Sequence, residues 1–204
     1  MTSSPFDPRH DVVVTARETV FQGYFRVDRY TLRHRLFGGG WSRDFKRELF
    51  ERGHAAAVLP YDAQRDRVLL IEQFRIGPYA HGGAPWQIEI VAGILHPGES
   101  PADLARREAH EEAGCTLTEL LPIVDYYMSP GAVSEHMTLF CALADLGLAG
   151  GVHGLDDEDE DIRVHVPSFD EAMHWLAAGR IQNSPAIIAL QWLALNRSRL
   201  RAGG

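Results

Sequence analysis

The apolar and polar positions of this chain predict strands over most of its first half. Residues 12–37 combine β-branched and aromatic side chains with partial alternation, which is typical of β structure. The segment RIGPYAHGGAP, residues 75–85, is interpreted as a loop because of its Gly and Pro content. Further apolar runs predict strands at residues 46–50, 55–61, 67–74 and 86–91.

A helix is predicted next, with clear signals at both ends. Ser100 suits an N-cap, Pro101 suits the first helical position, and Asp103 completes a capping box. Gly114 is placed to end the helix as a C′ glycine. The expected helix therefore covers residues 101–113.

The remaining elements complete a mixed pattern. Strands are predicted at residues 116–127, 136–144 and 162–166, a helix between Ser168 and Gly179, and another after Asn183-Ser184-Pro185. Strands and helices do not alternate strictly, so a doubly wound parallel sheet is not expected. We expect an α/β (α+β) fold, a mixed β-sheet sandwich flanked by helices. Residues 1–50 are assigned to an N-terminal β-rich region and residues 51–204 to the main domain.

Charge and composition exclude some classes of partner. The 204 residues include 45% hydrophobic side chains, enough for a normal core, and carry a formal net charge of -8. This charge disfavours nucleic acid and anionic membrane surfaces, and no apolar run is long enough for a membrane span. An anionic substrate would need local cations or bound metal ions.

The cysteines and the N-terminus predict a cytoplasmic protein. Cys115 and Cys141 show neither a C-x-x-C nor a zinc-ligand spacing, and both are expected to pack as reduced thiols. The first residues, MTSSPFDPRHDVVV, lack the basic and apolar regions of a secretory signal.

Three glutamates crowd the predicted helix within RREAHEEAG, residues 106–114. Glu108 lies four residues before Glu112 and three before Glu111, so all three project from one side. A solvated acidic face is one interpretation. The other is a site for a hard divalent cation such as Mg²⁺ or Mn²⁺, which prefers oxygen ligands.

The surroundings of these glutamates resemble the Nudix box. The pattern is G-x5-E-x7-R-E-A-x-E-E-x-G-C, and its small residues Ala109 and Cys115 replace the aliphatic positions of the family. The matched positions, seven within 22 residues, are Gly93, Glu99, Arg107, Glu108, Glu111, Glu112 and Gly114. The resemblance implies the fold and chemistry of a hydrolase of nucleoside diphosphates linked to another moiety.

The resemblance also implies roles for the box residues. Glu108 and Glu112 coordinate metal, with the carbonyl of Ala92 as a further ligand. Glu111 ligates directly or through water. Arg107 can hold Glu99 or a neighbouring carboxylate by a bidentate pair.

Segments outside the box are similar to bacterial ADP-ribose pyrophosphatases over residues 20–195. Pro130 stands sixteen residues beyond Gly114, as in that subgroup, although Ser-Pro-Gly is also a common turn. In the acidic segment LDDEDEDI, residues 155–162, matching positions imply Glu158 as the general base and Glu160 as a metal ligand. The repeated acidic residues leave this register open by one residue. An EF-hand pattern does not fit the segment.

Substrate contacts are implied for four further positions. Arg47 and Arg75 resemble residues that contact the diphosphate or the adenosine, and surface arginines at strand ends are an equal alternative for each. Glu135 matches a position near the terminal ribose. Tyr24 or Phe25 is a candidate for stacking on adenine from the partner subunit, because the family exchanges N-terminal strands across a homodimer; aromatic core residues are the alternative.

Three functions therefore remain open at the level of sequence. The expected one is Mg²⁺-dependent hydrolysis of ADP-ribose to AMP and ribose 5-phosphate, with Mn²⁺ as another possible metal. A hydrolase of another nucleoside diphosphate-sugar, such as GDP-mannose, would share the same box. A non-catalytic ADP-ribose sensor is less expected, since such proteins generally have a degraded box.

Overall fold

The structure, a computed structural model of the chain, describes residues 5–155 and 159–202. The chain divides into two compact units, Met1–Gly53 with Tyr127–Glu135, and His54–Tyr126 with His136–Gly204. We call them the N-terminal unit and the main unit. The predicted mixed α/β class is confirmed, with helices packed on one mixed and one antiparallel β-sheet in the main unit.

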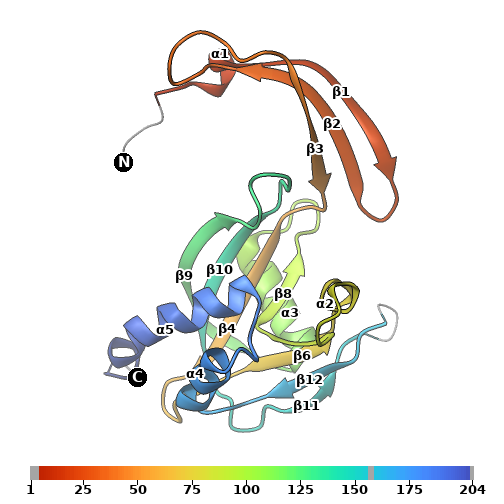
Figure 1. Cartoon of the computed structure of the whole chain (residues 1–204). Coiled ribbons are helices and arrows are strands. Elements are labelled where there is room, and N and C mark those ends of the chain that lie inside the picture. The colour runs from red at the N-terminus through yellow and green to blue at the C-terminus, as the bar shows by residue number, and fades with distance from the viewer. Residues whose placement is uncertain (1–4, 156–158, 203–204) are drawn as a thin grey trace. The chain divides into compact units, whose positions relative to one another are not determined.

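The N-terminal unit is a three-stranded antiparallel sheet preceded by one short helix (Figure 1). Its elements are α1 (Pro8–Asp11), β1 (Val12–Gln22), β2 (Arg26–His34) and β3 (Phe45–Glu51). The single β segment expected over residues 12–37 is thus a hairpin, because Gly23 and its neighbours turn the chain between β1 and β2. Residues 127–135 join this unit, since Phe50 donates to the carbonyl of Ala132 (2.8 Å) and accepts from the amide of Ser134 (3.3 Å).

One sheet of the main unit has a central pair of parallel strands. Its order is β5-β4-β10-β9, and β8 also pairs with β4. The strands are β4 (Ala55–Asp62), β5 (Arg67–Val68), β8 (Val91–Ile94), β9 (Leu117–Tyr127) and β10 (His136–Ala144). Every residue of β4 is buried, which is typical of a strand covered on both faces.

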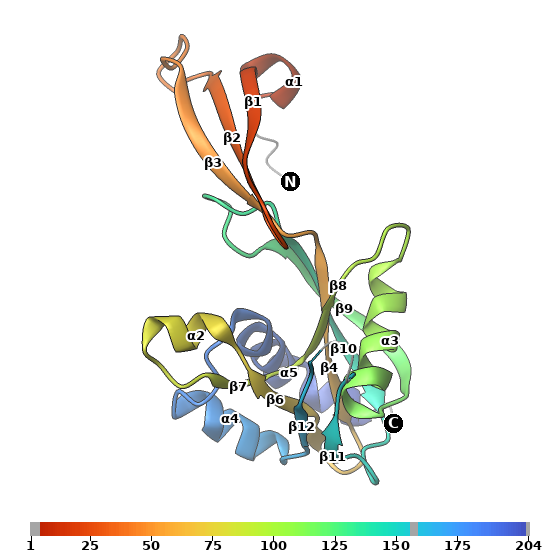
Figure 2. The same ribbon diagram turned by 90° about the vertical axis from the view of Figure 1, so that its right-hand side faces the viewer.

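Helices provide that cover from two sides. The helix α3 (Pro101–Ala113) packs on β8 and β4, whereas α5 (Ser184–Ala202) packs on β10 and β4. Figure 2 shows α3 and α5 on opposite sides of these strands. The predicted bounds of α3 are confirmed at both ends: Ser100 accepts from the amide of Asp103, and Gly114 adopts the left-handed conformation.

A second sheet of the main unit has the order β11-β12-β6-β7. Its strands are β6 (Leu70–Phe74), β7 (Trp86–Glu89), β11 (Gly151–His153) and β12 (Ile162–His165), followed in the chain by α4 (Phe169–Ala177). Ile71, Ile162 and Val164 of this sheet pack with Ala105 and Ala109 of α3 in one core cluster. The core therefore fixes α3 against both sheets.

The loop expected at residues 75–85 is wrong in part, because it contains the helix α2 (Ile76–His81). Pro78 lies in the first turn of this helix, where its missing N–H costs nothing. Gly82 ends the helix with φ 84°, so both supposed loop signals belong to a helix. Among the described residues, no helix has the length and apolar character needed to cross a bilayer.

Asp66 fastens α5 to the rest of the main unit. Its carboxylate accepts hydrogen bonds from Arg197 and from the hydroxyl of Tyr61 (2.7 Å), and it pairs with Arg201 (2.8 Å). Arg197 also pairs with Asp170 (2.9 Å) and lies over the ring of Phe169. The hydrogen bond from Arg197 holds the pKa of Asp66 below its usual range.

We predict that Arg197→Met lowers the free energy of unfolding by about 2 kcal/mol at neutral pH, the usual effect of losing a hydrogen bond between charged groups. A carboxylate whose pKa is lowered by folding stabilises the fold above its unfolded pKa and loses this effect as the pH falls. The difference between the two proteins should therefore shrink in acid. Urea unfolding followed by tryptophan fluorescence measures it.

Arg199→Ala is the matched control, because Arg199 lies on the same helix and bonds only Asn196 among the contacts that the structure describes. Its stability should equal that of the wild type. An unchanged Arg197→Met protein would contradict the role of Asp66.

Candidate functional site

Glu108 lies against the backbone of β8. A Cβ atom at Gly93 would overlap the carboxylate of Glu108, so glycine is required for this close approach. The position of Gly93 is set by β8, which pairs in antiparallel register with β4, and that of Glu108 by α3. The first glycine of the sequence motif therefore lies within a strand, where it makes room for a carboxylate.

Glu112 reaches the next residue of the same strand. The amide of Ala92 donates to its carboxylate (3.2 Å), and Glu112 is only 2% exposed. In an antiparallel pair, the N–H and C=O of one residue face the same side. Since the N–H of Ala92 faces Glu112 and away from β4, its carbonyl oxygen faces that side as well.

Burial makes these two carboxylates hard to ionise without a cation. It raises the pKa of Glu108 to about 7, with Arg107 opposing this shift and Glu111 adding to it. Burial raises the pKa of Glu112 well above its ordinary value, and the neighbouring Glu108 adds to that shift. A positive charge placed between them would reverse both effects.

Arg107 organises the acidic side chains around it. Its Nε donates to Glu99 (3.0 Å), and its Nη1 lies 3.0 Å from Glu108 and 2.8 Å from Glu111. The hydrogen bond from Arg107 lowers the pKa of Glu99, which also accepts from the amide of His96 (3.1 Å). The loop before α3 is thus fixed to the helix, and Glu111 is held by an arginine.

Glu160 belongs to the same electrostatic neighbourhood, because its charge contributes to the raised pKa of both Glu108 and Glu112. Its amide donates to the carbonyl of Leu155 (3.2 Å), and its carboxylate accepts from the amide of Leu155 (3.3 Å). Gly154, at φ 111°, leaves no space for a Cβ beside Glu160. The predicted base, Glu158, lies outside the described residues.

Arg75, the residue between β6 and α2, places a cation in this neighbourhood. Glu89 accepts from its Nε and from its Nη2 (2.8 Å). Burial opposes the charge of Arg75, but Glu89 outweighs it and the pKa is raised, with contributions from Glu112 and Glu160. The sequence did not predict a role for Glu89, because it resembles an ordinary residue of a strand. The feature that could have drawn attention to it is its position four residues before Gly93.

Glu108, Glu112 and Glu160, which we call the candidate cation site, fit a hard divalent cation by their chemistry. In the chain as described, no three His, Cys, Asp or Glu side chains already stand close enough to enclose an ion. Mg²⁺ usually keeps several waters and takes one or two carboxylates together with substrate phosphates. A partial set of protein ligands beside a backbone carbonyl therefore suits it.

The other predicted substrate residues belong to the N-terminal unit. Tyr24 is 88% exposed and meets the ring of Phe25 edge-on, whereas Phe25 also packs on Phe50, so Tyr24 is the more accessible ring. Arg47 is exposed and donates to the carbonyl of Lys46 (2.9 Å).

Glu135 is buried, and both of its oxygens accept from Arg52 at 3.0 Å. Pro130 follows β9 in the same unit and is exposed.

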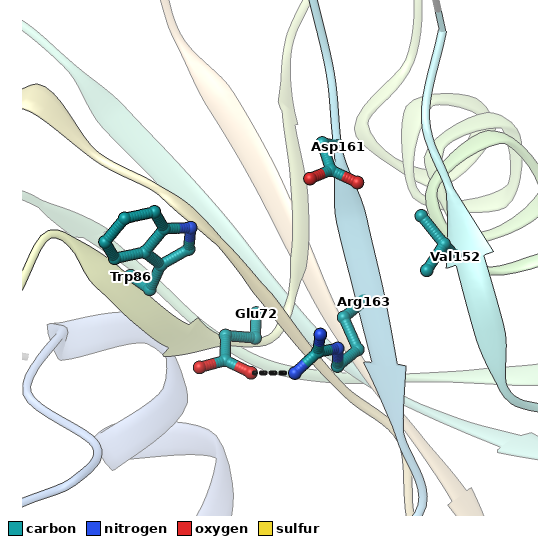
Figure 3. A pocket seen from close by; sticks show the side chains of 5 residues that line it. All are labelled: Glu72, Trp86, Val152, Asp161 and Arg163. Carbon is teal, nitrogen blue, oxygen red and sulfur yellow. Dashed lines mark ion pairs between the residues drawn. The ribbon is translucent and has the colours of Figure 1, made fainter.

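A hollow of about 330 Å³ lies on the other face of the second sheet. Figure 3 shows Glu72 and Arg163 pointing toward each other within it, 3.9 Å apart. Glu72 and Arg163 pair across β6 and β12, whereas Glu89 pairs with Ile71. Successive side chains of a strand point to opposite faces, so the hollow and Glu89 are on different sides of the sheet. The hollow is lined by Glu72, Trp86, Val152, Asp161 and Arg163.

Comparisons with known proteins agree with this geometry. A family model described as NUDIX domain matches residues 51–190. The ADP-ribose pyrophosphatase of Escherichia coli (strain K12) is 48% identical over 193 residues, which cover 95% of this chain and 92% of that protein. The GDP-mannose pyrophosphatase of Enterobacter sp. (strain 638) is 36% identical over 153 residues, which cover 74% of this chain and 78% of that protein.

A solved structure shares the fold. It is described as the crystal structure of ADP compounds hydrolase, with a TM-score of 0.70 over 94% of this chain and 97% of that one. The sequences are 21% identical, so this likeness concerns the fold alone.

We predict that Gly93→Ala weakens Mn²⁺ binding at least about tenfold, the usual effect of disturbing the support of a metal ligand. The added methyl group must push the carboxylate of Glu108 away from β8. Titration calorimetry with Mn²⁺ measures the affinity.

Gly77→Ala is the matched control, because a Cβ at Gly77 in α2 meets no described atom within 4 Å. Its affinity should equal that of the wild type. Normal Mn²⁺ binding by Gly93→Ala would show that the position of Glu108 does not matter.

Proposed function

Because the chain belongs to the NUDIX domain family, we propose that it hydrolyses the diphosphate of ADP-ribose with the help of a divalent cation. The products are AMP and ribose 5-phosphate. The observation that carries the proposal is the pair Glu108 and Glu112, held at the backbone of β8 where burial raises the pKa of both carboxyl groups. A bound cation would stabilise the ionised form of both carboxylates. The diphosphate of the substrate would supply further oxygen ligands to that cation.

The substrate is proposed from the relatives. The chain is similar over 95% of its length to a protein named ADP-ribose pyrophosphatase. A match of that length must cover most of the N-terminal unit, in which Tyr24 and Arg47 are exposed for contact with the nucleoside part.

The metal ligands proposed are Glu108, Glu112, Glu160 and the carbonyl of Ala92. Bound Mg²⁺, with Mn²⁺ as the alternative, supplies Lewis acidity that polarises the phosphoryl oxygens and stabilises the charge developing on them. Glu111 acts beside these ligands, directly or through water.

The other residues of the chain bind the substrate and move a proton. Arg75 donates to the diphosphate, as a guanidinium suits phosphate oxygens. Glu158 accepts a proton from the attacking water, whose oxygen forms the new bond to phosphorus while the bridging P–O bond breaks. Glu135 is proposed to lie near the terminal ribose, and Arg107 keeps Glu99 and Glu111 in place.

A homodimer is part of the proposal. The N-terminal unit exposes several large apolar side chains, and β1 is an edge strand with nearly every residue exposed. Edges and apolar surfaces of this kind are usually covered in the functional assembly. The exposed apolar residues are Val12, Val14, Val20, Phe21, Leu36 and Phe37. Exchange of these strands across a two-fold axis would cover them and bring Tyr24 to the partner's substrate.

Hydrolysis of GDP-mannose is the second candidate. The similarity to a GDP-mannose pyrophosphatase supports it, over a smaller share of the chain. Both reactions use the same box, so only the nucleoside and sugar contacts separate them.

A product assay with Mg²⁺ tests the proposal. The purified protein is offered ADP-ribose, GDP-mannose, ADP-glucose and a dinucleoside polyphosphate at equal concentrations. We predict the highest kcat/KM with ADP-ribose, with AMP and ribose 5-phosphate formed in equal amounts.

Two outcomes would contradict the proposed substrate. Faster turnover of GDP-mannose than of ADP-ribose would support the proposed diphosphate hydrolysis but show that ADP-ribose is not the preferred substrate. Turnover of none of these compounds would contradict the enzyme assignment and favour a binding role.

We also predict that Glu112→Gln lowers kcat at least about 100-fold, because a neutral amide is a poor ligand for a hard cation. Circular dichroism should show an unchanged fold. Glu119→Gln, at an exposed glutamate of β9, is the matched control and should keep full activity. Activity of Glu112→Gln within a few-fold of the wild type would remove Glu112 from the metal ligands.

A further inference from the structure

The ion pair between Arg75 and Glu89 has a geometry that fixes the direction of the arginine. Nη2 lies 2.8 Å from one oxygen of Glu89, and Nε lies 3.2 Å from both oxygens. This two-sided contact uses the Nε and Nη2 groups of the guanidinium, so the Nη1 group is left pointing elsewhere. A planar guanidinium held at two nitrogens has one orientation, whereas a free arginine has many.

The ion pair lies on the side of the second sheet that faces α3. Glu89 pairs with Ile71, and Ile71 pairs with Val164, so these side chains share one face of the second sheet. That face carries the core cluster against which α3 packs. The charges of Glu112 and Glu160 also contribute to the raised pKa of Arg75, so both carboxylates lie in the electrostatic neighbourhood of the guanidinium.

Glu89 itself stands on a rigid support. Its neighbour Ile88 is 3% exposed, and the carbonyl of Ile88 accepts from the amide group of Asn183 (2.7 Å). The side-chain oxygen of Asn183 accepts from the amide of Ala186 in the first turn of α5 (3.1 Å). These hydrogen bonds connect the end of β7 to the start of α5. The side chain of Glu89 itself is only 15% exposed.

We propose that Glu89 is a positioning residue that holds Arg75 so that Nη1 meets the diphosphate bound at the candidate cation site. The inference rests on the proposed function, and it adds a residue that the Nudix box does not contain. Glu89 neither touches substrate nor coordinates metal. Its effect passes entirely through Arg75.

The competing role for Glu89 is that of a further metal ligand. Both of its oxygens accept hydrogen bonds from Arg75, so a cation would have to compete with the guanidinium for them. The geometry therefore favours positioning. The two roles differ in a measurable way, because a ligand acts independently of Arg75 and a positioning residue does not.

A double-mutant cycle separates these roles. The variants are Arg75→Ala, Glu89→Gln and the double variant, with kcat and KM measured on ADP-ribose at saturating Mg²⁺. We expect Glu89→Gln to raise KM about tenfold with kcat nearly unchanged. In the Arg75→Ala background the same substitution should have no further effect, and the Mn²⁺ affinity of Glu89→Gln should equal that of the wild type.

Glu72→Gln is the matched control. Glu72 stands on the neighbouring strand β6, faces the opposite side of the sheet and bonds His165 (2.8 Å). Its KM should not change. A tenfold effect there would mean that any carboxylate lost from this sheet disturbs the site, which would overturn the inference.

Two further results would also overturn it. One is an additive cycle, in which Glu89→Gln impairs the Arg75→Ala protein as strongly as the wild type. The other is weakened Mn²⁺ binding by Glu89→Gln. Should the wild type turn over no ADP-ribose, the proposed function fails and the cycle is scored on the dissociation constant for ADP-ribose; absence of binding as well contradicts both.

Discussion

The close approach of α3 to β8 is the constraint on which the rest of the main unit depends. Gly93 lets the carboxylate of Glu108 reach the strand, and the amide of Ala92 donates a hydrogen bond to the carboxylate of Glu112. Two carboxylates buried side by side are unfavourable by desolvation and by mutual repulsion. Their position is imposed by the helix and the strand, and a bound cation would turn the unfavourable arrangement into an attractive one.

The surrounding structure keeps that approach in place. Arg107 supplies a permanent positive charge on the outer side of α3 and joins the loop before the helix to its middle. Alanines 105 and 109 face the core, where larger side chains would separate α3 from the sheets. The second sheet then contributes Arg75 with Glu89 and, beyond its strand β12, the segment that carries Glu160. In the proposed function, acidic and basic groups would thus meet a diphosphate from separate elements of the main unit.

Local signals in the sequence predicted a large part of this arrangement. The bounds of α3 follow from Ser100, Pro101 and Gly114, because capping is decided by neighbouring residues. The same local reasoning failed at α2, where Pro78 and Gly82 suit both a loop and the two ends of a short helix.

Features that depend on contacts between distant parts of the chain could not be predicted from the sequence. The attachment of residues 127–135 to β3 rests on backbone bonds of Phe50 to a segment some eighty residues away. The proposed role of Glu89 depends on its ion pair with Arg75, fourteen residues earlier, and this pairing is not evident from the sequence. The contact of Gly93 with Glu108 could not be predicted either, because it requires the packing of α3 on β8.

The most direct test of the candidate cation site is a crystal structure with Mn²⁺ and an ADP-ribose analogue whose bridging oxygen is replaced by a methylene group. Anomalous scattering locates the metal without assumptions about its ligands. We predict a peak bound by Glu108, Glu112 and the carbonyl of Ala92, next to the analogue's phosphate oxygens. A bound analogue with no anomalous peak against α3, or with metal only in the hollow beside Glu72, would contradict it.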